Sequence, residues 1–225
     1  MKALLYKEFK LSMHYICYIF VLVFPIMILI PAYPIAVGFI YVLTCYPILF
    51  LGANKGQQSN DLLYSVLLPV RKKDIVLARL TTVTILHFVF IVMLSILLPF
   101  ALIIQDALPS NETTPGLGLN GFVSVLSIAL IGYALADLIF FPIYYKHGKS
   151  IVASSLLMIL GFVTYLGIFT IALPYIPGMG WYEDILCNKG VGIQFLFLAI
   201  ALVIYAALHF VVYRVSSKNL EKVDL

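Results

Sequence analysis

Long apolar stretches alternate with short polar connections along this chain of 225 residues. Six of them are long enough to cross a bilayer as helices, because a hydrocarbon core of about 30 Å needs about 20 apolar residues. A helix forms hydrogen bonds between its own backbone N–H and C=O groups, which have no water to bind in hydrocarbon. The pattern therefore predicts an all-α polytopic membrane protein with six transmembrane helices, near residues 14–31, 34–54, 77–104, 120–141, 151–173 and 191–213.

Pro31 and Pro34 separate the first two stretches, in the sequence PAYP. Proline lacks a backbone donor and disturbs the interior of a helix. A tight reversal at the membrane surface is therefore favoured over one continuous span. We expect the first two spans to form a helical hairpin.

Residues 1–13, before the first span, predict an interfacial helix that lies on the membrane surface. Its apolar residues are available to lipid: Leu4, Leu5, Phe9 and Leu11. Its charged residues are available to water and headgroups: Lys2, Lys7, Glu8 and Lys10. A frayed tail on the cytoplasmic side is the alternative.

Basic residues collect on one side of the predicted membrane. If both termini are cytoplasmic, every Lys and Arg except Lys189 falls in a cytoplasmic segment. Short cytoplasmic loops carry an excess of Lys and Arg, so this arrangement is the one that the charges favour. We expect a single transmembrane domain over residues 1–225, with both ends cytoplasmic.

The composition agrees with a membrane protein. The chain is 63% hydrophobic and 11% charged, with a mean hydropathy of +1.09, whereas soluble domains carry about 25% charged residues. The net charge of +4 is spread between apolar runs and forms no solvated basic face. Lipid is therefore an expected partner, and nucleic acid is not.

Catalytic motifs are missing from the sequence. Asp137 is the only acid inside a predicted span, and there is no HExxH zinc motif or GxSxG nucleophile motif. GLGLNG at 116–121 matches GxGxxG but lies in an outer loop, and no phosphate-binding GxxxxGK[ST] occurs. The 4 histidines stand alone and the 3 cysteines lack metal spacing. We expect no catalytic residue, no metal site and no cofactor in this chain.

Asp137 lies about one turn inside the cytoplasmic end of the fourth predicted span. An ionised group at membrane depth costs several kcal/mol unless a partner or a function retains it. Arg79 and Lys55 are the candidate partners. A structural ion pair and a role in transport are both consistent with this position.

The sequence NDLLYSVLLPVRKKDIVLARL, residues 60–80, gathers charge behind a proline. Asn60 or Asp61 can cap a short helix that Pro69 ends. Its apolar face comprises Leu62, Leu63, Val66 and Leu67. Asp74 can cap a second helix that runs from Ile75 into the third span. The basic residues between the two helices lie at the cytoplasmic surface: Arg71, Lys72 and Lys73.

A membrane anchor for the third span explains the basic residues but not the short helix before them. A helix of about two turns is unstable alone in water, so it needs a surface to lie on. The membrane and another protein are the alternatives, and we favour a protein partner.

Three segments resemble a known family: LLYKEFK at 4–10, LLPVRKKDIVLARL at 67–80 and FPIYYKHGKS at 141–150. They are similar to segments of ABC-2 type permease subunits, the six-span membrane halves of bacterial ABC exporters. The small permeases of peptide and bacteriocin export, including phenol-soluble modulin exporters, resemble this chain most. Larger relatives have a long outer domain that this chain lacks.

The resemblance implies an N-terminal elbow helix at residues 2–12, with Lys7 and Glu8 at its charged position. It implies a coupling helix within the cytoplasmic segment 55–74 that docks on a separate ATPase, which binds ATP and Mg²⁺. The coupling residues are Asp61, Leu62, Leu63, Val66, Leu67, Arg71, Lys72, Lys73 and Asp74. A second cytoplasmic turn adds Tyr145, Lys146 and His147. Two permease halves would assemble with two ATPase subunits in the bacterial cell membrane.

The expected function is the membrane-spanning permease subunit of an ATP-driven exporter of amphipathic peptides or other hydrophobic cargo. Few charges within the spans argue against an ion-coupled transporter. The alternative is a non-transporting membrane protein, for example an immunity protein that binds a bacteriocin or a signalling partner.

Overall fold

A computed structural model describes residues 2–12, 15–26, 29, 70–107, 122–147, 151–169, 176–177 and 191–222. This part of the chain is helical and contains no strand, which confirms the all-α class for the residues described. In chain order the elements are α1 (Lys2–Lys7), the π-helix η1 (Glu8–Ser12), α2 (Tyr15–Ile26), α5 (Lys72–Ala107), α6 (Phe122–His147), α7 (Ile151–Gly167) and α9 (Val191–Glu221).

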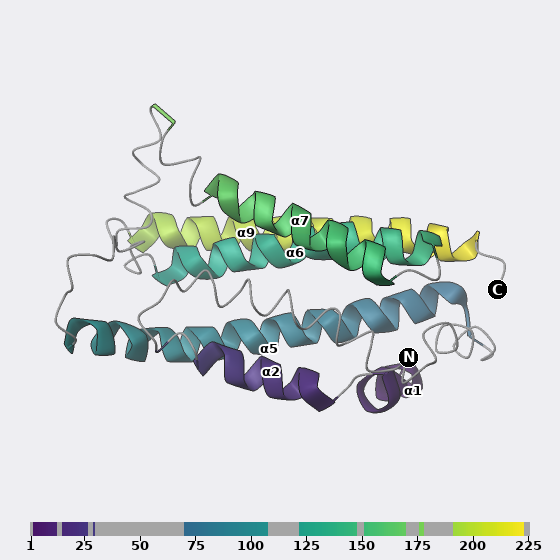
Figure 1. The fold of residues 1–225 in the computed structure, drawn as a ribbon, viewed down its shortest axis with the longest axis horizontal. Helices are drawn as coiled ribbons and strands as arrows, with labels where there is room; N and C mark the ends of the chain where they lie inside the picture. The colour runs from purple at the N-terminus through teal and green to yellow at the C-terminus, as the bar shows by residue number, and fades with distance from the viewer. Residues whose placement is uncertain are drawn as a thin grey trace.

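Figure 1 shows α2, α5, α6, α7 and α9 running lengthwise in one bundle, whereas α1 is seen almost end-on. Helices α5 and α7 begin at the end of the bundle at which α6 and α9 finish, and α1 lies at this end beside α5 (Figure 1). We call it the α1 end. The alternating directions match the order of crossings that the sequence predicts.

Three described segments are long and apolar enough to cross a membrane: Lys72–Leu97, Val123–Lys146 and Gly192–Glu221. Two shorter apolar helices, Ile16–Ile26 and Ile151–Gly167, overlap the first and fifth predicted spans. The second predicted span, 34–54, and residues 55–69 of the coupling segment lie outside the described residues. The total of six spans therefore stays a prediction.

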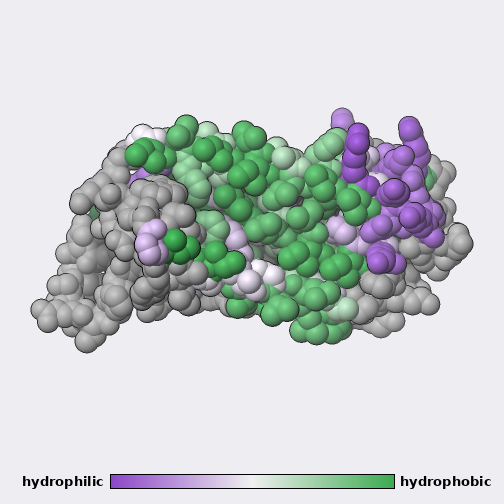
Figure 2. Space-filling model, turned by 90° about the horizontal axis from the view of Figure 1, so that it is seen from above, coloured by the Kyte–Doolittle hydropathy of each residue, from purple (hydrophilic) through white to green (hydrophobic). Residues whose placement is uncertain are grey.

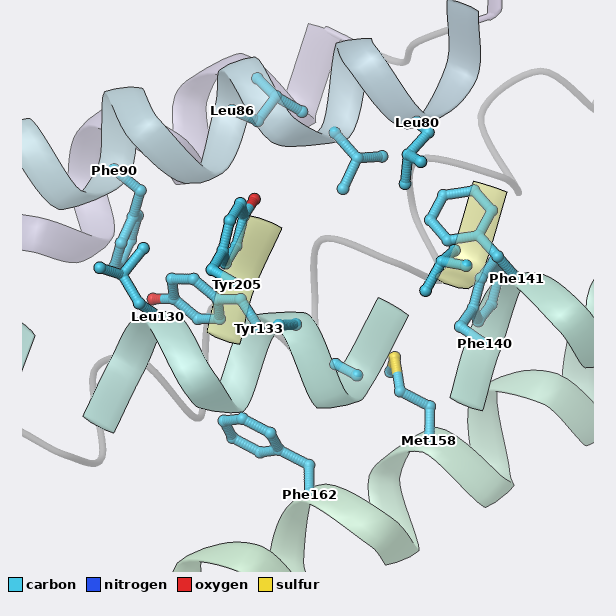
Figure 3. Packing of buried hydrophobic residues seen from close by; sticks show 14 of the residues in the cluster. Leu80, Leu86, Phe90, Leu130, Tyr133, Phe140, Phe141, Met158, Phe162 and Tyr205 are labelled. Atoms are coloured by element: carbon cyan, nitrogen blue, oxygen red, sulfur yellow. The ribbon is translucent and has the colours of Figure 1, made fainter. Parts of the chain in front are cut away.

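Helix α6 lies at the centre of the bundle. In its most apolar window 72% of the residues are buried, against 22% in α9, and its main neighbours are α9 and α7. Small residues allow the close approach to α7: a Cβ at Gly132 would lie 2.7 Å from the ring of Phe162. Figure 3 shows Met158 and Phe162 of α7 directed toward α6.

The outer surface is apolar along most of the bundle. Figure 2 shows a hydrophobic face that gives way to hydrophilic residues at the α1 end, where α9 finishes. Exposed apolar side chains of α7 and α9 include Val152, Leu156, Leu160, Phe195, Leu196, Val203 and Phe210. Apolar surface of this extent is stable against lipid or another apolar surface rather than water.

Two helices extend further than the apolar pattern predicts. Helix α9 runs to Glu221, and α6 continues through Pro142 to His147 instead of ending near residue 141. Pro142 lacks the N–H that would bond the carbonyl one turn earlier, yet α6 continues past it. The side-chain nitrogen of Asn219 donates to the Pro142 carbonyl at 2.9 Å and ties this part of α6 to α9. Tyr144 and Tyr145 then continue the buried aromatic side of α6 by stacking on Phe140 and Phe141.

Candidate functional site

Four polar side chains from three helices meet in the middle of the bundle. We call them the core cluster: His87 of α5, Asp137 of α6, and Tyr205 and His209 of α9. Nε2 of His209 lies 2.8 Å from Oδ2 of Asp137, and Nδ1 of His87 lies 3.8 Å from the same oxygen. The Asp137 side chain is fully buried and that of His209 is 11% exposed. The cluster is therefore withdrawn from the surface of the bundle.

Hydrogen bonds orient both imidazole rings. Nδ1 of His209 lies 3.0 Å from the carbonyl oxygen of Tyr205, one turn earlier in α9. Nδ1 of His87 lies 3.1 Å from the hydroxyl of Tyr205. Because a carbonyl only accepts, Nδ1 of His209 carries a proton in this contact. Nε2 of His209 is thus the nitrogen that faces the carboxylate.

Aromatic rings enclose the core cluster. Tyr133 of α6 stacks on His87, with 4.7 Å between the ring centroids, and Tyr205 stacks on His209 at 4.0 Å. Figure 3 shows Tyr133 and Tyr205 close together between α5 and α6, with Phe90 beside them. A polar group at such a place is retained only where it is well paired.

Asp137 lies deeper than the sequence predicts. Helix α6 continues for ten residues beyond Asp137, to His147, which is about 15 Å at the rise of an α-helix. The expectation of a position one turn from the cytoplasmic end was wrong, because α6 does not stop at Pro142. Asp137 therefore has its polar neighbours within the bundle, on α5 and α9.

A second polar cluster joins the N-terminal helix to α5 and α6. Nε of Arg79 donates to Oε2 of Glu8 at 2.9 Å, and Nη2 to Oε1 at 3.4 Å. Nη1 of Arg79 reaches the hydroxyl of Tyr144 at 3.4 Å, and Nζ of Lys7 lies 3.5 Å from Oε1 of Glu8. All four side chains are buried. We call this group the elbow cluster: Lys7, Glu8, Arg79 and Tyr144.

The elbow cluster corrects two expectations. Lys7 and Glu8 were assigned to water and headgroups but face α5. Arg79 was a candidate partner of Asp137, yet it binds Glu8, while Asp137 lies against the two histidines. The reason is register: α5 and α6 run in opposite directions, which brings Arg79 level with Tyr144 and His87 level with Asp137.

The start of α5 lies at the α1 end. The helix begins at Lys72, so Asp74 lies in its first turn and is not the cap of a helix from Ile75, as the sequence predicted. Arg71 and Asp74 form a partly exposed pair with 3.8 Å between Nε and Oδ2. Lys73 pairs with Glu221 of α9 at 3.3 Å. This end is therefore charged, partly exposed and linked to the end of α9.

The structure describes only some of the other residues of the predicted coupling site. Asp61, Leu62, Leu63, Val66 and Leu67 lie outside the described residues. Tyr145, Lys146 and His147 were assigned to a turn but belong to the last turn of α6. Tyr145 is buried and Lys146 is exposed, so Lys146 is the one of these two whose side chain faces outward.

Sequence reasoning missed the roles of His87, Tyr205 and His209. The histidines were treated as isolated because they are far apart in sequence and on different spans. A weak signal was present: His87, Asp137 and His209 are ionisable residues within long apolar helices, where such residues are rare. Their meeting depends on the register of α5, α6 and α9.

Comparison with known protein families gives a match over most of the chain. A family model described as "ABC-2 family transporter protein" matches residues 3–220. Neither the curated proteins nor the solved structures contain a match to the chain. The matched residues include both polar clusters and the three described transmembrane candidates, except for Glu221 at the end of the last one.

Proposed function

The chain belongs to the ABC-2 transporter family, and we propose that it is the membrane-spanning permease subunit of an ATP-driven ABC exporter. Family membership supports a role as a membrane transport component and implies association with an ABC ATPase. In this proposal the partner subunit binds ATP and Mg²⁺ and hydrolyses the nucleotide. The permease provides the path for amphipathic peptides or other hydrophobic cargo.

The observation that carries the coupling proposal is the buried bond between Glu8 and Arg79. It fixes the N-terminal helix against the first two turns of α5, which begins directly after the predicted coupling segment. A movement of that segment by the ATPase would therefore move α5 and the N-terminal helix together. This is the behaviour expected of an elbow helix next to a coupling helix.

The α1 end is the proposed cytoplasmic end. Three exposed basic side chains lie at this end: Arg71 directly before α5, Lys146 in the last turn of α6 and Lys218 near the end of α9. A cytoplasmic position for this basic end is supported by the positive-inside rule. It would place both termini in the cytoplasm of a bacterial cell, on the side where an ATPase meets its nucleotide.

A second permease half is part of the proposal. Helix α9 exposes apolar side chains along most of its length, although it packs on α6 and α5 on its other side. In the assembly such a face would meet lipid, cargo or the second half. An apolar path between two halves suits amphipathic or hydrophobic cargo, because it offers burial of apolar surface rather than ionic contacts.

Co-purification with an ATPase tests the proposed function. The permease is expressed with each ABC ATPase encoded near its gene, and the complex is isolated in detergent through a tag on the permease. Changing Leu63 and Leu67 together to Asp should abolish the complex and leave membrane insertion intact, since two charges then occupy the docking face. Changing Gln57 and Gln58 to Asp adds the same charge outside that face and should leave the complex intact.

Retention of the ATPase by the Leu63→Asp/Leu67→Asp variant would overturn the docking site. The non-transporting alternative makes a different prediction for cells. An immunity protein protects its host even when the ATPase carries a substitution that prevents hydrolysis, whereas an exporter does not. Protection by the permease beside an inactive ATPase would therefore contradict the transport proposal itself.

A further inference from the structure

We propose that His87, Asp137 and His209 form a binding site for one divalent transition-metal ion in the core of the bundle. Each residue offers one ligand atom, and these atoms all lie within 4.8 Å of one another. Two imidazoles and one carboxylate suit ions such as Zn²⁺, Co²⁺ or Ni²⁺, whereas Mg²⁺ and Ca²⁺ prefer sites made of oxygen. The site is independent of ATPase docking, which concerns the α1 end.

The distances fit a shared ion. Two ligands of a tetrahedral zinc ion lie about 3.4 Å apart, given metal–ligand bonds of about 2.1 Å. The two distances to Oδ2 of Asp137, 2.8 Å from His209 and 3.8 Å from His87, lie on either side of that value. The three ligand atoms lie within 4.8 Å of one another, so coordination requires both rings to turn toward Asp137 and His87 Nδ1 to leave the Tyr205 hydroxyl.

The protons on the ring of His209 point to a cation between the side chains. Nδ1 carries a proton because it faces the Tyr205 carbonyl. In the neutral ring Nε2 then has a lone pair, and it faces a carboxylate oxygen at 2.8 Å. Two acceptors at this distance need a positive charge between them, either a proton or a metal ion.

The second histidine favours the metal ion. A proton between His209 and Asp137 would satisfy those two residues and needs no third group. His87 also directs Nδ1 toward Oδ2 of Asp137, from a third helix, and its side chain is 1% exposed. The same nitrogen lies 3.1 Å from the Tyr205 hydroxyl, a contact that it would exchange for the ion. Three convergent ligand atoms exceed what an ion pair requires and equal the number of protein ligands in a catalytic zinc site, which leaves a fourth position open.

The surroundings resemble the outer shell of a metal site. Metal-ligating histidines donate their other ring N–H to a carbonyl or carboxylate, as His209 does toward Tyr205. The rings of Tyr133 and Tyr205 enclose both imidazoles and keep the local dielectric low. An ion bound here would join α5, α6 and α9, and binding to the folded state alone would stabilise the bundle.

Metal binding is measured on the full-length protein, purified in detergent through an affinity tag without histidine and stripped with EDTA. Zn²⁺, Co²⁺ and, for comparison, Mg²⁺ are added, unbound ions are removed by gel filtration, and metal content and melting temperature are measured. We expect about one equivalent of Zn²⁺ per chain and a higher melting temperature with Zn²⁺ than with Mg²⁺. Bound Co²⁺ should show visible absorption typical of nitrogen and oxygen ligands.

Single variants locate the site. His87→Ala, Asp137→Asn and His209→Ala should each weaken Zn²⁺ binding by at least about tenfold. His147→Ala, at the end of α6, is the matched control and should bind as the parent does. Where a variant does not fold, the Co²⁺ spectrum of the parent protein still reports the ligand set.

Two outcomes would overturn the proposal. The parent protein would take up less than about a tenth of an equivalent of Zn²⁺ and show no Co²⁺ band, in which case a proton lies between His209 and Asp137. Alternatively, folded variants lacking either core histidine would bind Zn²⁺ as tightly as the His147→Ala control, which would put the ion elsewhere.

Discussion

Arg79 and Glu8 are joined by two hydrogen bonds, from Nε to Oε2 at 2.9 Å and from Nη2 to Oε1 at 3.4 Å. The two residues are 71 positions apart, and both side chains are buried. A paired contact of this kind fixes orientation as well as distance. The N-terminal helix is thus a fixed part of the bundle and not a separate tail.

Removing Glu8 from the elbow cluster should destabilise the protein strongly. Glu8→Met leaves the buried charges of Lys7 and Arg79 without the carboxylate that they share, at a cost of about 3–5 kcal/mol, whereas Arg79→Met leaves Glu8 with Lys7 and should cost less. The triple variant Lys7→Met/Glu8→Met/Arg79→Met removes all three charges and should recover most of the loss. Thermal unfolding in detergent measures the effect. Lys73→Ala breaks a half-exposed pair with Glu221 and should cost less than about 1 kcal/mol. A triple variant as unstable as Glu8→Met would contradict this account.

Gly132→Ala should destabilise the contact between α6 and α7. The added methyl would lie 2.7 Å from a ring carbon of buried Phe162, and overpacking of this kind costs about 1–3 kcal/mol. Gly161→Ala is the matched change on the opposite helix. Its methyl would meet the end of the flexible Ile139 side chain, so the gain in helix propensity should offset the contact. Equal melting temperatures for the two variants would show that Phe162 moves without cost.

Asn219→Ala should loosen the ends of α6 and α9 without unfolding the bundle. The amide of Asn219 donates to the Pro142 carbonyl across 77 residues of sequence, and a bond of this kind is worth about 1 kcal/mol. Hydrogen exchange followed by mass spectrometry should show faster exchange at residues 143–147 and little change in the middle of α6. Uniformly faster exchange along α6 would contradict a local role.

Cysteine labelling should place the two ends of α9 on opposite sides of the membrane. In a protein with Cys17, Cys45 and Cys187 replaced by Ala, single cysteines are introduced at Arg71, Gly192 and Lys218. All three positions are exposed in the structure. An impermeant maleimide should label Arg71→Cys and Lys218→Cys from one face, which the proposal makes cytoplasmic, and Gly192→Cys from the other. Labelling of all three from one face would rule out a membrane-spanning α9.

The sequence by itself determined the class of the protein and the approximate positions of the described helices. A single apolar segment of about 20 residues can span hydrocarbon only as an α-helix, so composition and segment length were sufficient to predict an all-α membrane protein. Helix ends were less predictable, because Pro142 is a stop signal in isolation. The hydrogen bond from Asn219 and the stacking of Tyr144 and Tyr145 form only in the packed bundle, where α6 extends to His147.

Only the tertiary structure decided which polar residues meet. The pairs Glu8–Arg79 and Asp137–His209 join positions on different helices, and a difference of two turns in register decides whether Arg79 or His87 faces Asp137. Hydrophobic burial sets that register through the summed packing of many apolar side chains. The sequence around a charged residue does not specify this register, so the partner of each charged residue could be identified only from the tertiary structure.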